Sequence, residues 1–194
     1  MINRRFQDLT LILASRSPRR QYLLKELGLE FEILTTNVDE TYPEGLPPEE
    51  VANYLAKKKA DSFDVSRIPS KSVIISADTI VTIDGKILGK PGTYSDAVKM
   101  LKMLSGRKHD VYTSVCLRSR NKEKSFTVKS SVFFKTLSME EIEYYIENFQ
   151  PFDKAGGYGI QEWIGYIGIE KIEGSFFNIM GLPVKELYEE LLKF

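Results

Sequence analysis

The 194-residue sequence contains a single cysteine and a single histidine, and this scarcity excludes several kinds of protein. One cysteine can form neither an intramolecular disulfide nor a cysteine-based zinc cluster. Cys116 lies in the apolar stretch YTSVCL, so we expect it in the core rather than acting as a catalytic thiol. His109 is interpreted as a structural residue; a Ser-His-Asp arrangement stays open but has no local support.

Long apolar stretches are also absent from the sequence. None approaches the roughly 20 consecutive apolar residues that a membrane-spanning helix needs. The basic start, MINRRFQD, is followed by LTLILA, which is too short for the core of a signal peptide. These features predict a cytoplasmic protein with no membrane partner.

The chain has no excess of charge of either sign. Lys and Arg total 27, Asp and Glu total 27, and the isoelectric point is about 6.6. A protein that binds the phosphate backbone of nucleic acid needs a basic face, so nucleic acid is disfavoured as a partner. A local cluster of cations in a neutral protein points instead to a small anionic ligand.

Hydrophobic periodicity predicts strands alternating with helices early in the chain and mainly strands later. We expect an α/β fold with a mixed sheet, in one domain over residues 1–194. The predicted strands cover residues 9–14, 31–36, 110–118 and 125–135, with hairpins at 73–88, turning at Asp84-Gly85, and at 164–180. The predicted helices cover residues 18–27, 49–63, 95–104 and 183–192, with another beginning at the capping box Ser138–Glu141.

The first candidate site is the segment SRSPRR at the start of a predicted helix. Ser17 is a suitable N-cap and Pro18 suits the first helical position. Arg19 and Arg20 then lie where the helix dipole is already positive, which costs roughly 0.3–1 kcal/mol for each cation. Free backbone N–H groups and two guanidinium groups favour an anion site, such as one for phosphate. The alternative is a surface helix whose arginines pair with nearby acids.

Asp78 and Lys59 are charged residues at positions where apolar side chains are expected. Asp78 shares one face of a predicted strand with Ile74 and Ile80, where a carboxylate is costly unless it is paired or binds a metal. Lys59 is the only charge on the apolar stripe of its helix and either snorkels or points inward at phosphate. An ordinary strand-end aspartate that holds a loop is the alternative for Asp78.

Further candidates are Lys90 in the motif GKP, Glu40 in VDET, and the glycine-rich loop DKAGGYGIQ. The loop either supplies backbone contacts to a ligand or simply forms a tight bend. Carboxylates without a histidine cluster favour a hard divalent cation, Mg²⁺ or Mn²⁺, over zinc.

Taken in order, these motifs resemble the Maf family of nucleoside triphosphate pyrophosphatases. The resemblance runs from Leu11 nearly to the end of the chain and rests on ASRSPRR, VDE, the Lys-Ala of AKKKA, SADT, GKP, LSGR, DKAGGYGIQ and MGLP. It implies an elongated α/β structure, similar to inosine triphosphatases, with two lobes around a cleft. It leaves room for a homodimer, since dimers are common in the family.

The resemblance also implies roles for individual residues. Asp78 would be the catalytic proton acceptor, and Glu40 would join it in binding a divalent metal or water. The phosphate-handling cations would be Arg19, Arg20, Lys59 and Lys90, with Ser15 and Ser17 lining the same pocket.

Within the family the chain matches the branch that acts on dTTP and UTP, through Arg19, Thr79 and Gln161. We expect hydrolysis between the α and β phosphates, with Thr79, Gln161 and the loop backbone selecting the pyrimidine; activity on modified pyrimidine nucleotides is left open. Gly157 and Glu162 replace a more usual Ala and Gly, which puts the loop's shape in question. The alternative function is a non-catalytic nucleotide sensor or a partner-binding regulator of cell division.

Overall fold

The computed structural model describes Phe6 and residues 8–194; the rest of the basic start of the chain lies outside the described residues. Two short 3-10 helices, η1 (Pro151–Asp153) and η2 (Ala155–Gly157), form part of the glycine-rich loop. The other elements are β1 (Thr10–Leu13), α2 (Pro18–Glu26), β2 (Glu32–Ile33), α3 (Pro48–Asp61), β3 (Ser72–Ile83), β4 (Lys86–Leu88), α4 (Tyr94–Leu104), β5 (Lys108–Arg118), β6 (Glu123–Phe134), α5 (Met139–Phe149), α6 (Trp163–Gly168), β7 (Ile169–Glu173), α7 (Phe176–Met180) and α8 (Val184–Leu191).

The described strands form one mixed sheet in the order β2-β1-β3-β5-β6-β7, with β4 paired to β3. Strand β1 runs parallel to β2 and β3, whereas β4 and β7 run antiparallel to β3 and β6. The register of the central pair places Leu11 beside Val73 and Leu13 beside Ile75. The predicted α/β class, with a mixed sheet and flanking helices, is confirmed.

The chain divides into two compact units. Unit 1 comprises Met1–Asp78, Thr113–Val128 and Gly181–Phe194, and unit 2 comprises Thr79–Tyr112 and Lys129–Met180. Strands β3, β5 and β6 each contribute residues to both units. Within β3 the division falls between Asp78 and Thr79. One domain with a cleft between two lobes stays a prediction.

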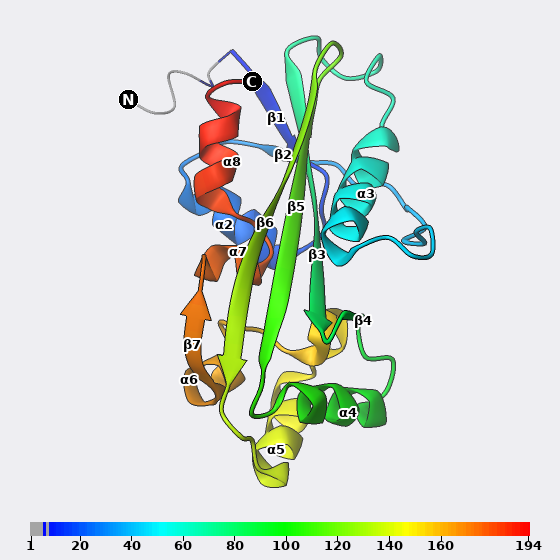
Figure 1. The fold of residues 1–194 in the computed structure, drawn as a ribbon. Helices are drawn as coiled ribbons and strands as arrows, with labels where there is room; N and C mark the ends of the chain where they lie inside the picture. Colours follow the sequence, from blue (N-terminus) through cyan, green and yellow to red (C-terminus); the bar gives the residue numbers. More distant parts are fainter. Residues whose placement is uncertain (1–5, 7) are drawn as a thin grey trace. The chain divides into compact units, whose positions relative to one another are not determined.

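Unit 1 packs helices on both sides of its strands. Helix α3 lies on one side, and α2 and α8 lie on the other (Figure 1). The Ser76 hydroxyl of β3 donates a hydrogen bond of 2.6 Å to the Ala56 carbonyl of α3. Cys116, which is fully buried, packs in one cluster with Ala56 and Ala60. Helix α3 is thereby held against the face of β3 that carries Asp78.

Unit 2 contains the predicted turn and the predicted capping box. Asp84 and Gly85 have φ values of 50° and 74°, the left-handed pair that a two-residue hairpin requires. At the start of α5, the Ser138 hydroxyl accepts from the Glu141 N–H while the Glu141 carboxylate accepts from the Ser138 N–H. Both predictions are confirmed. Helix α4 packs against α5 and η2.

The predicted hairpin over residues 164–180 is wrong. Only Ile169–Glu173 is a strand there, and it pairs with β6 rather than with the following segment. SFFNIM forms α7 because the Ser175 hydroxyl accepts from the Asn178 N–H and begins a helical turn. The Asn178 amide then donates to the Val111 carbonyl at 3.3 Å and to the Ser130 hydroxyl at 3.0 Å. These contacts outweigh the strand preference of phenylalanine and isoleucine.

In the part of the chain that the structure describes, no helix is both long and apolar enough to span a bilayer.

Candidate functional site

The junction between β1 and α2 has the geometry that the sequence predicted. Ser17 is the N-cap and Pro18 begins the helix, although the Ser17 side chain makes no capping hydrogen bond. The Ser17 N–H instead donates to the buried Ser15 hydroxyl at 3.2 Å. No acidic residue lies in the first turn of α2, where Arg19 and Arg20 are partly buried. The helix therefore directs its positive end and two cations at one region of unit 1.

Arg20 is positioned by contacts from two directions. Its Nε donates to the Gly181 carbonyl at 2.8 Å, and its Nη1 donates to the Ser15 hydroxyl at 3.4 Å. Burial lowers the pKa of Arg20, opposed by the negative charges of Asp78 and Glu40 and reinforced by Arg19. Arg20 thus lies within electrostatic reach of both predicted carboxylates. Gly181 belongs to the MGLP motif, for which the sequence suggested no specific role.

Lys59 of α3 joins the two predicted carboxylates. Its ammonium forms an ion pair with Glu40 Oε1 at 2.8 Å and a short one with Asp78 Oδ1. The Asp78 and Lys59 side chains are 11% and 16% exposed, whereas that of Glu40 is 49% exposed. Lys59 therefore points inward and does not snorkel. We call Arg19, Arg20, Lys59, Asp78 and Glu40 the charged cluster.

The donor set of the charged cluster suits a hard divalent cation. Asp78 and Glu40 both reach the same ammonium, so two carboxylates converge on one position in unit 1. Among the described residues, no group of three His, Cys, Asp or Glu side chains is placed to hold a metal ion. Mg²⁺ is commonly held by one or two carboxylates together with substrate phosphates and water. The residues present fit a cation of that kind.

Unit 2 contains the other predicted residues, beginning with Lys90. It is exposed and follows β4 in the motif GKP. The preceding Gly89 carbonyl accepts a 3.0 Å hydrogen bond from the Gly156 N–H, which joins GKP to the glycine-rich loop. The Gly157 N–H donates to the Lys154 carbonyl at 3.0 Å, and the Gly159 N–H donates to the Tyr145 hydroxyl at 2.9 Å. All three glycine donors are therefore already used within unit 2.

Gln161 and Thr79 are the predicted specificity residues. The Gln161 Oε1 atom is buried and has no hydrogen-bond partner among the described residues. A buried acceptor of this kind is costly until it meets a donor. Thr79 directly follows Asp78 in β3, so strand alternation directs their side chains to opposite faces.

Sequence reasoning missed a buried ionic group beside Gln161. The Lys154 ammonium, whose side chain is 9% exposed, lies 3.1 Å from Glu162 Oε1 and 2.6 Å from Asp153 Oδ1. The Tyr145 hydroxyl donates a short hydrogen bond to Glu162 Oε2. The signal in the sequence was the resemblance, which implies another residue at the position of Glu162. We call Tyr145, Lys154 and Glu162 the loop clamp.

His109 and Cys116 are structural, as predicted. His109 Nε2 pairs with the Tyr158 hydroxyl at 2.7 Å, and Nδ1 has no hydrogen-bond partner among the described residues. The Ser-His-Asp alternative is therefore not supported. Burial lowers the pKa of His109 to about 4 and raises that of Cys116 to about 12, so both side chains are neutral near pH 7.

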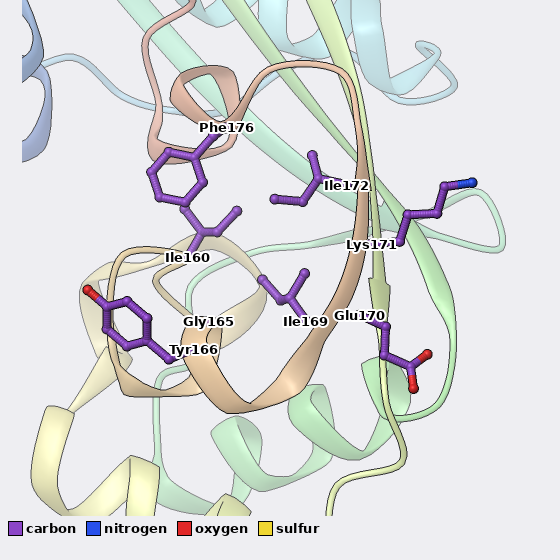
Figure 2. A pocket seen from close by; sticks show the side chains of 8 residues that line it. All are labelled: Ile160, Gly165, Tyr166, Ile169, Glu170, Lys171, Ile172 and Phe176. Atoms are coloured by element: carbon purple, nitrogen blue, oxygen red, sulfur yellow. The ribbon is translucent and has the colours of Figure 1, made fainter.

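A pocket of about 240 Å³ in unit 2 is lined by none of the individually predicted site residues, although Ile160 of the glycine-rich loop forms part of its wall. Figure 2 shows it beside β7, with Ile169, Ile172 and Phe176 supplying apolar walls. Its lining has no cluster of cations that would suit a phosphate group. The other lining residues are Ile160, Gly165, Tyr166, Glu170 and Lys171.

Comparison with known proteins identifies close relatives over nearly the whole chain. A dTTP/UTP pyrophosphatase of Bacteroides thetaiotaomicron is 52% identical over 184 residues, covering 94% of this chain and 95% of that protein. A protein of the same name from Porphyromonas gingivalis is 50% identical over 186 residues, and covers 95% and 94% of the two chains. Another from Christiangramia forsetii is 46% identical over 191 residues, covering 98% and 97%.

Solved structures support the fold. The Staphylococcus aureus Ham1 protein aligns with a TM-score of 0.50 and 16% identity, over 93% of this chain and 99% of that one. A HAM1 protein from Coxiella burnetii gives the same TM-score at 14% identity, over 96% and 100% of the chains. The family model described as Maf-like protein matches residues 10–194. With this match and relatives about half identical along its length, the chain belongs to the Maf family.

Proposed function

We propose that this chain hydrolyses dTTP and UTP to the nucleoside monophosphate and pyrophosphate. The observation that carries the proposal is the charged cluster: Lys59 contacts both carboxylates, Arg20 interacts electrostatically with them, and Arg19 and Arg20 lie in a first helical turn without acidic residues. Relatives that are about 50% identical over more than 90% of the chain carry the name dTTP/UTP pyrophosphatase. The chemistry of the cluster and the name of the relatives agree.

Binding of the triphosphate is assigned to the cations and the adjacent hydroxyl groups. Arg19 and Arg20 offer guanidinium donors where the helix dipole also favours an anion. Ser15 and Ser17 form the strand-to-helix turn beneath them, and Ser15 holds the Arg20 side chain. The ligand then supplies the negative charge that the first turn of α2 lacks. We assign the same role to Lys59, whereas a phosphate contact of Lys90 stays a prediction.

Asp78 is assigned the proton transfer. Lys59 contacts Asp78 Oδ1, and we propose that Oδ2 orients a water molecule and accepts its proton. The water oxygen bonds to the α-phosphorus, the bond from that phosphorus to the bridging oxygen breaks, and pyrophosphate leaves with the bond's electron pair. Arginine and lysine side chains stabilise the charge that builds up on the departing group.

A divalent cation, Mg²⁺ or Mn²⁺, is part of the proposal. Asp78 and Glu40 would hold it, together with phosphate oxygens and water. When bound, it supplies Lewis-acid polarisation of the phosphoryl oxygens. Lys59 contacts both carboxylates, so its ammonium is close to the position that the cation would take.

Recognition of the base is assigned to Gln161, with Thr79 as a second contributor. The buried Gln161 Oε1 can accept a hydrogen bond from a base that carries an N–H donor. A base without that donor leaves the oxygen unpaired, which gives strong discrimination. The Gly156, Gly157 and Gly159 N–H groups are used inside the protein, so a side chain rather than the loop backbone suits this role.

Three further expectations accompany this function. The neutral overall charge supports the absence of a nucleic-acid ligand. A cytoplasmic location and a homodimer stay predictions. Light scattering of the purified protein measures whether it is a dimer.

The test is turnover of a panel of nucleoside triphosphates by the purified protein, with and without Mg²⁺ or Mn²⁺. We expect monophosphate and pyrophosphate in equal amounts, fastest with UTP and dTTP. Nucleotide binding without any product would favour the non-catalytic sensor instead. Asp78→Asn provides the matched control, because it keeps the side-chain shape while removing the proton acceptor.

A further inference from the structure

Glu162 lies beside the candidate base-reading residue and is held by two buried partners. Its carboxylate accepts hydrogen bonds from the Lys154 ammonium at 3.1 Å and from the Tyr145 hydroxyl. Burial and the adjacent carboxylate raise the pKa of Tyr145 above its usual value, so its hydroxyl remains a donor. The same hydroxyl accepts from the Gly159 N–H at 2.9 Å. The loop clamp thereby fixes both Glu162 and the backbone of the glycine-rich loop.

Gly159 brings the Glu162 and Gln161 side chains together. A Cβ at this glycine would lie 2.8 Å from Glu162 Cδ and 3.1 Å from Gln161 Nε2. Both side chains therefore approach the same backbone position, and Nε2 is the Gln161 amide atom that comes near it. A carboxylate attracts the N–H end of an amide and repels its carbonyl oxygen. The carboxylate therefore favours an amide orientation that leaves Oε1 as the buried acceptor without a partner.

The orientation of this amide decides which pyrimidine fits. Uracil and thymine carry an N–H donor at ring position 3, whereas cytosine has an acceptor at that position. An amide that presents Oε1 matches the first two bases, and a reversed amide that presents its NH₂ group matches cytosine. Glutamine by itself does not select between them, because both orientations have the same shape.

We propose that Glu162 is a positioning residue for pyrimidine selection: its charge, held by Lys154 and Tyr145, orients the Gln161 amide so that Oε1 accepts from the N–H of uracil or thymine. This inference rests on the proposed function and on Gln161 as the base-reading residue.

The test compares kcat/KM for UTP and CTP in the wild type and in Glu162→Gln. The substitution keeps the side-chain shape and removes the charge, so the Gln161 amide becomes free to reverse. We expect the ratio of the UTP value to the CTP value to fall about tenfold, the effect of roughly one hydrogen bond. The change is expected in KM, because Glu162 does not take part in the chemistry at Asp78. Tyr145→Phe is expected to lower the ratio less, since Lys154 still holds the carboxylate.

Tyr144→Phe is the matched control for Tyr145→Phe, because it removes a tyrosine hydroxyl one position earlier in α5, where the ring is 48% exposed and packs at a tilt against Trp163. Its UTP-to-CTP ratio is expected to equal that of the wild type. If Glu162→Gln leaves an uncompensated buried ammonium and fails to fold, Lys154→Met/Glu162→Gln removes both charges of the pair together. Folded variants whose ratio stays within about twofold of the wild type would overturn the proposal.

Calorimetric titration with UTP and with CTP separates this inference from the proposed function. A wild type that binds UTP more tightly than CTP but yields no product contradicts the proposed hydrolysis and leaves the selection mechanism measurable as a ratio of Kd values. A fall in that ratio in Glu162→Gln supports the inference. A wild type that binds both nucleotides equally overturns it, whatever its turnover.

Discussion

Replacing Lys59 by methionine removes the cation that neutralises Asp78 while keeping a long apolar stem on α3. The Asp78 side chain is 11% exposed, so its carboxylate would be left buried with its ion pair broken. Breaking a buried ion pair from one side costs about 3–5 kcal/mol of unfolding free energy. The partial exposure of Glu40, the second partner, places the expected loss near the lower value, about 3 kcal/mol.

That loss is measured by thermal unfolding at pH 7 without nucleotide. For a chain of this size, about 1 kcal/mol lowers Tm by roughly 2–4 °C, so Lys59→Met should melt about 6–12 °C below the wild type. The double variant Lys59→Met/Asp78→Asn should regain part of this loss, since no buried charge is left unpaired. Lys57→Met is the matched control, because Lys57 pairs with Glu123 at a more exposed position and its loss should cost about 0–1 kcal/mol. A Lys59→Met protein that melts within about 2 °C of the wild type would refute the reasoning.

Four further predictions follow from the same contacts. Arg19→Glu should raise the stability of the protein without nucleotide by at most about 1 kcal/mol, because an acid suits the helix start. The same change should raise KM for UTP and dTTP sharply. Lower stability with unchanged kinetics would show that the arginine is structural. Removal of divalent cations with a chelator should abolish turnover and Mn²⁺ or Mg²⁺ should restore it, and full activity in the chelator would remove Glu40 and Asp78 as metal ligands. His109 has a pKa of about 4 in the folded protein against 6.5 ordinarily, so its neutral form contributes about 3 kcal/mol of stability above pH 6.5. This contribution disappears as the pH falls from 6.5 to 4. Denaturant titrations of His109→Gln should therefore show a smaller loss of unfolding free energy over that range. Cys116, fully buried and with a pKa of about 12, should resist thiol reagents at pH 8 until denaturant is added, and rapid labelling of the native protein would contradict its place in the core.

Local patterns predicted most elements because the chemistry that begins and ends them is local. The Ser138–Glu141 capping box and the Asp84-Gly85 turn involve residues within four positions of one another, and both form as expected. The failure at α7 has a different origin. Its helical turn depends on Ser175, and its anchoring on contacts of Asn178 with Val111 and Ser130, which are 67 and 48 residues away in the chain.

The candidate site was predictable where a residue contradicts its local surroundings. Lys59 on an apolar helix face and Asp78 in a buried strand are each unfavourable alone, and the structure pairs them. The loop clamp was not predictable, because Tyr145 is an ordinary apolar-face residue of α5 and its hydroxyl acts only through Glu162, 17 positions further along the chain. The place of Gly181 against Arg20 likewise depends on residues 161 positions apart.

The most direct test of the proposed hydrolysis is the reaction of UTP in ¹⁸O-labelled water with the wild type and with Asp78→Asn. The account predicts UMP and pyrophosphate in equal amounts, with the label in UMP, since water attacks the α-phosphorus. It also predicts that Asp78→Asn remains folded and loses most of kcat. Formation of UDP and phosphate, label in pyrophosphate, or an Asp78→Asn protein with wild-type kcat would contradict it.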